Sequence, residues 1–574
     1  MMVPMYIDTI PNRNSPPAVL LRQGTRRGKK IDKETLLNLR DWPKPVVEGL
    51  RRLLRGETLV SVDDLFETER SIPHGHVQAV LGTIRRLGVD RLLASEHCRE
   101  RDLVVAMIAE RLLYPCSKLA TTRLWHTTTL AEELAVGDAE VDELYDALDW
   151  LLDRQERIEK KLARRHLGEG ATVFYDVSSS SYEGRTCALA QRGYNRDGER
   201  GLLSIVYGVM TDAEGRPVAV EVYRGDTADP KTVPDQVEKL RERFGLKHVV
   251  LVGDRGMLTH AQIEQLRQYP QLGWISTLRS PAIRKLVDSG AIQLSLFDQQ
   301  NLAEITSPDY PGERLVVCYN PLLAEERRRT RESLVAATET EFEKIAAAVR
   351  RRTKTPLGKD EIGVKVGRVC HRYKVAKHFH LTIEDNRFHW QRNPQSLARE
   401  QALDGLYVVR TSEPVERLSS DNVVRQYKDL RLVEQAFRCL KGMDILVRPI
   451  RHRTDDHVRA HIFLCFLAYY VQWHMRKAWA PLLFEDEELD ANRWRRDPVA
   501  PAQPSRSVRR KKATRLTSDG FPVHSFDTLL ADLSTRCRNL CRTKLPKHSY
   551  TFTQITQPTP LQRRALDLLG LCSQ

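Results

Sequence analysis

Four apolar segments between residues 172 and 257 restrict the folds that this chain can adopt. They read TVFYDVSS (172–179), GLLSIVYGVM (201–210), PVAVEVYRG (217–225) and VVLVGDRGM (249–257), and a helical segment at about 231–244 precedes the fourth. Short runs rich in β-branched and aromatic residues indicate strands. A helix of this length supplies the crossover that a parallel return requires, so the fourth strand can lie beside the first. We therefore expect an α/β fold built on a mixed sheet.

Two of these strands carry a carboxylate where the neighbouring residues are typical of a core. They are Asp176 in the first strand and Asp254, which follows the fourth. In neighbouring strands both side chains would reach one edge of the sheet. A buried pair of carboxylates repels itself unless it is protonated or binds cations, and Mg²⁺ prefers such oxygen ligands. The alternative is that each Asp caps the turn after it; this fits Asp254 less well, because Thr259 and Gln262 already form a capping-box pattern.

A later helix supplies a third acid. In YKDLRLVEQAFRCLK (427–441), residues placed at 100° intervals give one polar stripe, which consists of Tyr427, Arg431, Glu434, Arg438 and Lys441. One interpretation is a solvated face held by ion pairs four residues apart. The other is a phosphate site in which Glu434 completes the metal ligands. In that case we expect contacts to DNA phosphates from Arg255, Tyr427, Arg431, Arg438 and Lys441.

The charge of the chain favours an anionic partner. Lys and Arg number 91 against 76 Asp and Glu, so the net charge is +15, which is typical of proteins that bind nucleic acid. An anionic membrane surface is the alternative partner. No signal-peptide pattern is visible, and the most apolar run, HIFLCFLAYYVQW (461–473), is too short to span a bilayer and indicates a buried helix. We therefore expect a soluble, cytoplasmic protein. We expect no zinc module, because no Cys-x-x-Cys pair occurs.

The chain is too long for a single hydrophobic core. We expect five regions: a basic, then helical N-terminal region, a first half of the sheet domain, an insertion, a second half, and a basic linker with a C-terminal region. Their expected bounds are 1–165, 166–280, 281–400, 401–480 and 481–574. Residues 1–60 suggest a small hairpin followed by turns. The Pro- and Arg-rich segment 498–515 is expected to be mobile and able to lie along phosphates.

One N-terminal segment has two interpretations. SKLATTRLWH (117–126) is either a contact to phosphates through Lys118 and Arg123 or a solvated helix that Ser117 caps.

Taken together, these segments resemble the DDE transposases of bacterial insertion sequences, in the branch whose catalytic Glu lies in a Tyr-Arg-Glu-Lys signature. The matching segments, in family order, are SKLATTRLW, FYDVSS, VYRGDTADPKT, VLVGDRGM, DGLYVVRTS, VEQAFRCLK and HIFLCFLA. The resemblance implies a ribonuclease H-like sheet, with Asp176, Asp254 and Glu434 as catalytic acids and metal ligands. It also implies a large insertion between the fourth strand and the Glu helix, and a helical N-terminal domain that binds transposon ends. The signature departs at one position, because its Arg lies at 431 and not one residue earlier, at Leu430.

The resemblance further implies metal-dependent cleavage of transposon ends and strand transfer to target DNA. Two Mg²⁺ (or Mn²⁺) ions, roughly 3.5 to 4 Å apart, would serve this chemistry. DNA is the implied partner, a homodimer the implied assembly, and the bacterial nucleoid the implied location. In related enzymes an aromatic residue of the insertion stacks on a flipped base; Trp390 is the candidate here, and a core position is its alternative.

Other functions remain as alternatives. A ribonuclease H-like nuclease without strand transfer would share all three acids, and a noncatalytic DNA-binding derivative would have lost one. A phosphatase is disfavoured because DVSS lacks a second Asp two residues after the first. A nucleoside-triphosphate enzyme is disfavoured because no Gly-x-x-x-x-Gly-Lys-Ser/Thr loop occurs.

Overall fold

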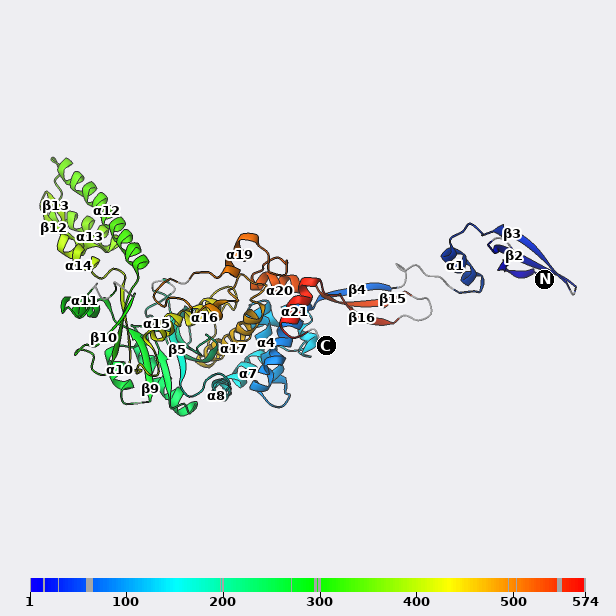
Figure 1. The fold of residues 1–574 in the computed structure, drawn as a ribbon, viewed down its shortest axis with the longest axis horizontal. Coiled ribbons are helices and arrows are strands. Elements are labelled where there is room, and N and C mark those ends of the chain that lie inside the picture. The colour runs from blue at the N-terminus through cyan, green and yellow to red at the C-terminus, as the bar shows by residue number, and fades with distance from the viewer. Residues whose placement is uncertain are drawn as a thin grey trace. The chain divides into compact units, whose positions relative to one another are not determined.

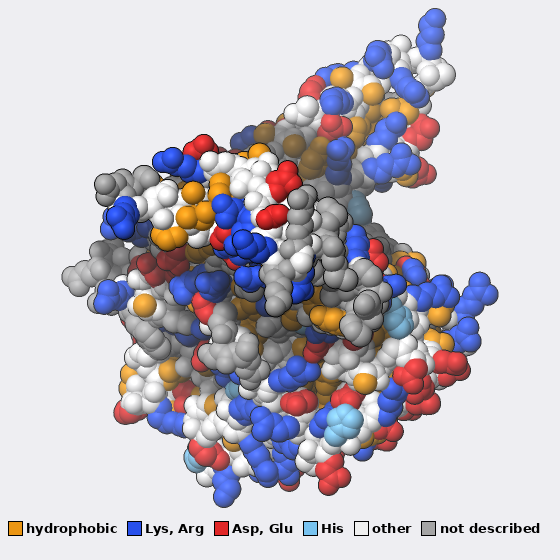
Figure 2. Space-filling model, turned by 90° about the vertical axis from the view of Figure 1, so that its right-hand side faces the viewer, with side chains coloured by type: hydrophobic (Ala, Val, Ile, Leu, Met, Phe, Trp, Pro, Cys, Tyr) orange, Lys and Arg blue, Asp and Glu red, His pale blue; other side chains and the backbone are white. Residues whose placement is uncertain are grey.

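The computed structural model divides the chain into two compact units. It describes residues 2–13, 16–28, 30–57, 66–196, 198, 201–269, 271–293, 297, 301–493, 495–501, 503–544 and 550–571. The first unit comprises Met1–Ile72 and Arg536–Gln557, and the second comprises Pro73–Thr535 and Pro558–Gln574 (Figure 1). On the face shown in Figure 2, Lys and Arg side chains are frequent, and acidic side chains are interspersed among them.

The first unit contains two small sheets and one helix. Strands β1 (Met2–Ile10), β2 (Ala18–Arg27) and β3 (Lys30–Asn38) form an antiparallel sheet, followed by α1 (Lys44–Leu54). The predicted hairpin is therefore extended by a third strand. The second sheet has the order β16-β15-β4 and joins β4 (Phe66–Pro73) to β15 (Cys537–Thr543) and β16 (Thr551–Ile555) from the other end of the chain. No local pattern in the sequence signals that long-range pairing.

The second unit is built on an eight-stranded sheet with the order β10-β11-β14-β9-β8-β5-β6-β7. The first five of these strands in the chain are β5 (Ala171–Ser181), β6 (Ser204–Thr211), β7 (Pro217–Arg224), β8 (Val249–Val252) and β9 (Leu272–Thr277). Strand β5 is antiparallel to β6 and parallel to β8, and β8 is parallel to β9. The prediction that the fourth strand lies beside the first is confirmed. Three antiparallel strands followed by two parallel ones, in the order β7-β6-β5-β8-β9, are the ribonuclease H-like arrangement.

The predicted insertion 281–400 contributes to this sheet. Its strands β10 (Leu302–Ile305) and β11 (Arg314–Tyr319) extend the sheet next to β14 (Leu406–Thr411), which pairs antiparallel with β9. The rest of the insertion forms its own hydrophobic core, and Figure 1 shows these elements grouped together. They are α12 (Pro321–Arg351), α13 (Lys359–Tyr373), β12 (Phe379–Glu384), β13 (Arg387–Arg392) and α14 (Pro394–Gln401). Trp390 lies in this core, 5.9 Å from the ring of Phe379, so the core interpretation of Trp390 is confirmed.

The N-terminal helices share one hydrophobic core with the sheet. They are α2 (Gly75–Leu87), α3 (Val89–Leu93), α4 (Arg99–Leu113), α5 (Lys118–Leu124), α6 (Leu130–Glu133), α7 (Val141–Leu152) and α8 (Gln155–His166). Helices α2, α4 and α7 pack against α17 (Asp455–Trp479), which is buried along most of its length and also packs against β7. The buried helix predicted at 461–473 is therefore present, whereas the expected boundary at residue 165 does not separate two cores. None of the described helices is long and apolar enough to cross a membrane.

Two local predictions have different outcomes. Ser117 caps α5 by accepting a hydrogen bond from the backbone N–H of Ala120 (3.2 Å), as predicted, but Lys118 is buried and not solvated. Segment 498–515, expected to be mobile, contains helix α19 (Arg506–Thr514), and the carbonyl of Val499 accepts hydrogen bonds from Asn320 and Lys428. Side chains of the sheet domain thus satisfy the backbone of this segment and hold it in place. The other α-helices are α9 (Val233–Glu238), α10 (His260–Leu266), α11 (Ser280–Asp288), α15 (Ser420–Asp429), α16 (Arg431–Lys441), α18 (Leu489–Arg493), α20 (Phe526–Ser534) and α21 (Pro560–Leu568).

Candidate active site

The register of β5 and β8 brings the two aspartates together. Phe174 pairs with Val252 in these parallel strands. Asp176 and Asp254 each lie two residues further along, so they reach the same level at the edge where the parallel strands end. Each strand is apolar and buried up to this point, which fixes the register and places both carboxylates without help from other elements.

Each aspartate uses one carboxylate oxygen for its own backbone. Oδ1 of Asp176 accepts a hydrogen bond from the N–H of Val177 (2.8 Å). Oδ1 of Asp254 accepts from Gly256 (2.9 Å) and Met257 (2.7 Å), so the capping interpretation holds for this oxygen of Asp254. Within the described part of the chain, Oδ2 of neither residue accepts a hydrogen bond, and both residues are half-buried. One oxygen of each carboxylate is therefore oriented, and the other remains available to a ligand.

The surroundings of Asp176 disfavour its ionised form. Burial raises the pKa of Asp176 to about 7, and the neighbouring carboxylate of Asp254 acts in the same direction, against the Val177 N–H. An ion pair of Arg196 and Asp229, which lie after β5 and β7, also affects Asp176. Arg196 lowers the pKa of Asp176, and Asp229 raises it. The pair of aspartates therefore has an excess of negative charge that a proton or a cation would neutralise.

Helix α16 (Arg431–Lys441) covers the face of the sheet to which Asp176 points. Tyr207 of β6 pairs with Ser178, two residues after Asp176, and the ring of Tyr207 lies 5.8 Å from that of Phe437 on α16. Since residues two apart in a strand point to one face, Asp176 faces the same helix. Glu434 lies one turn before Phe437 and is exposed. Asp176 and the helix that carries Glu434 are thus on one side of the sheet.

The charges of one strand acid and of the helix acid both affect Tyr427. Its hydroxyl accepts a hydrogen bond from the Thr277 hydroxyl (3.0 Å), which is at the end of β9. Burial raises the pKa of Tyr427, and the charges of Asp254 and Glu434 both contribute in the same direction. The charges of Asp254 and Glu434 thus act on the same phenol. Among the described residues, however, no group of three or more His, Cys, Asp or Glu side chains is positioned to hold a metal ion.

The polar stripe predicted for one continuous helix is divided, and that part of the prediction is wrong. The segment forms two helices, α15 (Ser420–Asp429) and α16, with Leu430 between them. Tyr427 is half-buried and lines a cavity of about 170 Å³ together with Arg255. Arg431 is exposed and lines a different cavity, of about 1170 Å³. The interruption at Leu430 changes the direction of the residues that follow it.

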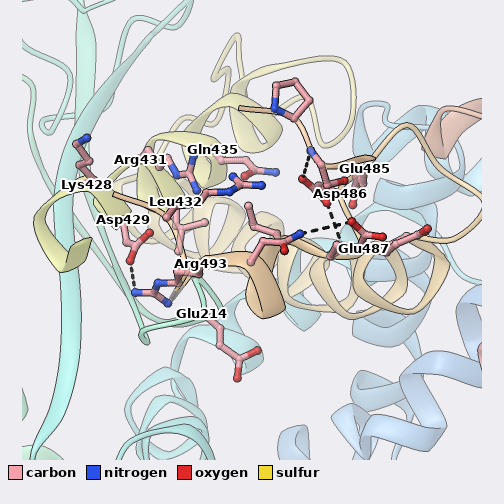
Figure 3. A pocket seen from close by; sticks show the side chains of 18 of the residues that line it. Glu214, Lys428, Asp429, Arg431, Leu432, Gln435, Glu485, Asp486, Glu487 and Arg493 are labelled. Carbon is pink, nitrogen blue, oxygen red and sulfur yellow. Dashed lines mark hydrogen bonds and ion pairs between the residues drawn. The ribbon is translucent and has the colours of Figure 1, made fainter. Parts of the chain in front are cut away.

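The larger cavity lies between α16 and the segment 485–506. Figure 3 shows Arg431 and Gln435 on the α16 side and Glu485, Asp486 and Glu487 on the opposite side. An ion pair between Asp429 and Arg493 joins the two sides. Of the other predicted phosphate contacts, Arg438 is exposed on α16, and Lys441 is half-buried at its end.

Arg196 and Asp229 also affect Asp176, although no pattern in the sequence indicated either residue. Asp229 lies in VYRGDTADPKT, a segment that carried the family resemblance but received no role. Arg196 lies in a polar loop without any periodicity, so only the fold reveals its position.

Comparison with known proteins adds one family match. The model of a family described as "Transposase DDE domain" matches residues 173–471, a span that contains Asp176, Asp254 and Glu434. No curated protein matches the chain. Among solved structures, the chain is similar to a piggyBac transposase in a synaptic complex with hairpin DNA, at 11% identity and a TM-score of 0.24, with 78% of this chain and 85% of that chain covered.

Proposed function

Because the chain belongs to the transposase DDE domain family, we propose that Asp176, Asp254 and Glu434 form an active site that cuts DNA at the ends of a mobile element and joins the freed ends to target DNA. The chain is a transposase, an enzyme that cleaves DNA, and DNA is its partner. The observation that carries the proposal is the register that aligns Asp176 with Asp254 under the helix of Glu434.

The donor set fits a divalent cation, as this family generally uses. Two carboxylates with available oxygens, one of them held partly protonated near pH 7 by burial, are hard ligands with an excess of negative charge. Asp176, Asp254 and Glu434 would hold the metal. Two Mg²⁺ or Mn²⁺ ions bound there would activate the attacking oxygen and stabilise the leaving one.

The proposed reaction has two phosphoryl transfers. In the first, water forms a bond to phosphorus at the element boundary, the bond to the 3′-oxygen breaks, and that oxygen takes a proton. In the second, the new 3′-OH attacks a phosphodiester of the target, and the displaced target 3′-oxygen takes the proton. The first step hydrolyses one phosphoester bond and the second exchanges one such bond for another, so neither requires an organic cofactor or a covalent protein intermediate.

The other residues of the site orient the DNA strand. The backbone N–H groups of Gly256 and Met257 fix the Asp254 carboxylate, and the Thr277 hydroxyl orients the phenol of Tyr427. Arg255, Arg431, Arg438 and Lys441 would neutralise phosphates. Because Arg255 and Arg431 line different cavities, these two residues would bind different parts of a strand and not a single phosphate.

We also propose an assembly and a location. Two copies would pair the two ends of the element, and the helical region 75–166 and the basic first unit would bind end DNA. The protein would act in the bacterial cytoplasm, on the nucleoid. The excess of 15 positive charges over the whole chain supports its association with DNA.

A plasmid carrying the inverted repeats that flank the reading frame tests the proposal. With Mg²⁺, the purified protein should release the repeat-bounded segment and join its 3′ ends to a second plasmid. Asp176→Asn should bind the repeats without cleaving them, whereas Asp226→Asn, an exposed aspartate at the same edge that pairs with Arg224, should retain activity. Cleavage without joined products would support the nuclease instead, and binding without cleavage by the wild type would support a DNA-binding protein.

A further inference from the structure

Two loops meet at the catalytic edge of the sheet. Strands β5 and β7 are both antiparallel to β6, so they run in the same direction, and both continue past the level of Asp176 to end at Ser181 and Arg224. The loop after β5 contains Arg196, and the segment after β7 leads to Asp229. The N–H of Gly225, just after β7, donates to the carbonyl of Leu189 (2.9 Å) and joins the two loops.

Glycines allow these loops to pack in backbone contact. A Cβ atom on Gly193 would come within 2.1 Å of the Gly225 carbonyl oxygen, and one on Gly225 within 1.9 Å of the Ser204 carbonyl oxygen. Any side chain at either position would push the loops apart. The N–H of Arg196 in turn donates to the Ser179 hydroxyl of β5 (3.0 Å). Residues 194–196 are therefore held on the sheet from both sides.

Arg196 presents unused hydrogen-bond donors beside the catalytic carboxylates. It forms an ion pair with Asp229, and its side chain is 19% exposed. Of its five N–H donors, one bonds to Asp229, and within the described residues the other four have no partner. A guanidinium held by one carboxylate, with further donors directed elsewhere, suits a phosphate group.

The aromatic ring of Tyr194 lies next to this guanidinium and is exposed to solvent. The residue is 80% exposed, and the guanidinium carbon of Arg196 lies 5.8 Å from the ring centre. A single exposed tyrosine needs no explanation by itself. A tyrosine beside an arginine, at the edge that carries two catalytic carboxylates, has the composition of a subsite for single-stranded nucleic acid, in which the cation holds the backbone and the ring stacks on a base.

We propose that Arg196 binds a backbone phosphate of the DNA strand next to the scissile bond and that Tyr194 stacks on a base of the same strand. This inference rests on the proposed function, because it requires that DNA enters the site at Asp176 and Asp254. It places the aromatic contact to the substrate at the edge of the sheet and not in the insertion that contains Trp390.

An abasic scan tests the stacking. Duplexes that carry the terminal repeat receive one abasic residue at each position around the cleavage site, and binding is measured without divalent ions. For the wild type, one position should weaken binding by roughly 5- to 100-fold. Tyr194→Ala should weaken binding of intact DNA to the same extent and show no further loss at that position, whereas Tyr194→Phe should behave as the wild type. If the abasic residue weakens the binding of Tyr194→Ala as much as it weakens the binding of the wild type, the stacking is refuted.

The salt dependence of binding tests the phosphate contact. Arg196→Ala should lower the slope of log K against log salt by roughly 0.7 to 0.9, and Arg196→Lys should restore most of it. The control is Arg241→Ala, since Arg241 lies 4.3 Å from the ring of Tyr269 in an equivalent pair near the starts of β8 and β9, at the opposite edge. An unchanged slope in Arg196→Ala would overturn the contact. If the scan succeeds while the wild type cleaves no DNA, the proposed function fails and the subsite stands; if the wild type cleaves and the scan fails, only the subsite fails.

Discussion

Replacing Asp176 with asparagine should stabilise the metal-free protein, although it abolishes the proposed activity. The pKa of Asp176 is about 7 in the folded protein against an ordinary value of 3.8. Each unit of pKa corresponds to about 1.4 kcal/mol, so ionised Asp176 costs about 4 kcal/mol of folding free energy above pH 7. The asparagine side chain would keep the shape and the acceptor for the Val177 N–H without carrying the charge. The substitution therefore removes this cost.

The sign of the pH dependence follows from which state binds the proton. Between about pH 4 and pH 7 the folded protein holds a proton on Asp176 and the unfolded chain does not, so the stability of the wild type falls as the pH rises. The advantage of the Asp176→Asn variant should be about 2 kcal/mol at pH 5.5 and about 4 kcal/mol at pH 8. Mg²⁺ should reduce this advantage by stabilising only the wild type.

Urea unfolding of both proteins at the two pH values, with and without Mg²⁺, measures these differences. Asp309→Asn, at an exposed aspartate before β11, controls for the loss of one negative charge and should show no such trend. An advantage of Asp176→Asn that stays constant between pH 5.5 and pH 8 would refute the reasoning, because it would mean that Asp176 is ionised throughout this range and that burial does not raise its pKa.

Three further predictions concern the other residues. Asp254→Ala and Glu434→Ala should each abolish cleavage of plasmid DNA while end binding, measured by gel shift, changes little; full cleavage by either variant would remove that residue from the site. Arg431→Ala should leave the cleavage position unchanged and lower the salt slope of DNA binding by about 0.9, whereas an unchanged slope would mean that Arg431 only solvates α16. Trp390→Ala should destabilise the core of the insertion by about 2 to 4 kcal/mol in urea unfolding without changing the response to abasic DNA, since its ring packs on Phe379.

The sheet and the two strand acids could be predicted because their signals are local and periodic. The residues of β5 and β8 are apolar up to a carboxylate, and the helix between them has the length of a parallel crossover. Once β8 lies beside β5, the positions of Asp176 and Asp254 follow from counting two residues past the paired Phe174 and Val252. No knowledge of the rest of the chain is needed for that step.

Other features depend on contacts that no window of sequence contains. Whether β10 and β11 belong to an insertion or to the sheet is decided by the pairing of β11 with β14, which is about ninety residues further along the chain. The Pro- and Arg-rich segment 498–515 has the composition of a mobile linker, yet Asn320 and Lys428 bind its backbone. A periodicity of 3.6 residues likewise could not reveal the interruption at Leu430, because no Gly or Pro marks it and both Leu430 and Arg431 are good helix formers.

The third acid is positioned by a different kind of contact from the other two. Asp176 and Asp254 are fixed by strand register, whereas Glu434 depends on how α16 packs on β5 and β6 through Phe437. Leu430 separates α16 from α15, and the ion pair of Asp429 with Arg493 holds the end of α15 to the segment across the larger cavity. The position of Glu434 therefore rests on the packing of Phe437 against Tyr207, whereas the strand register that aligns the two aspartates does not extend to it.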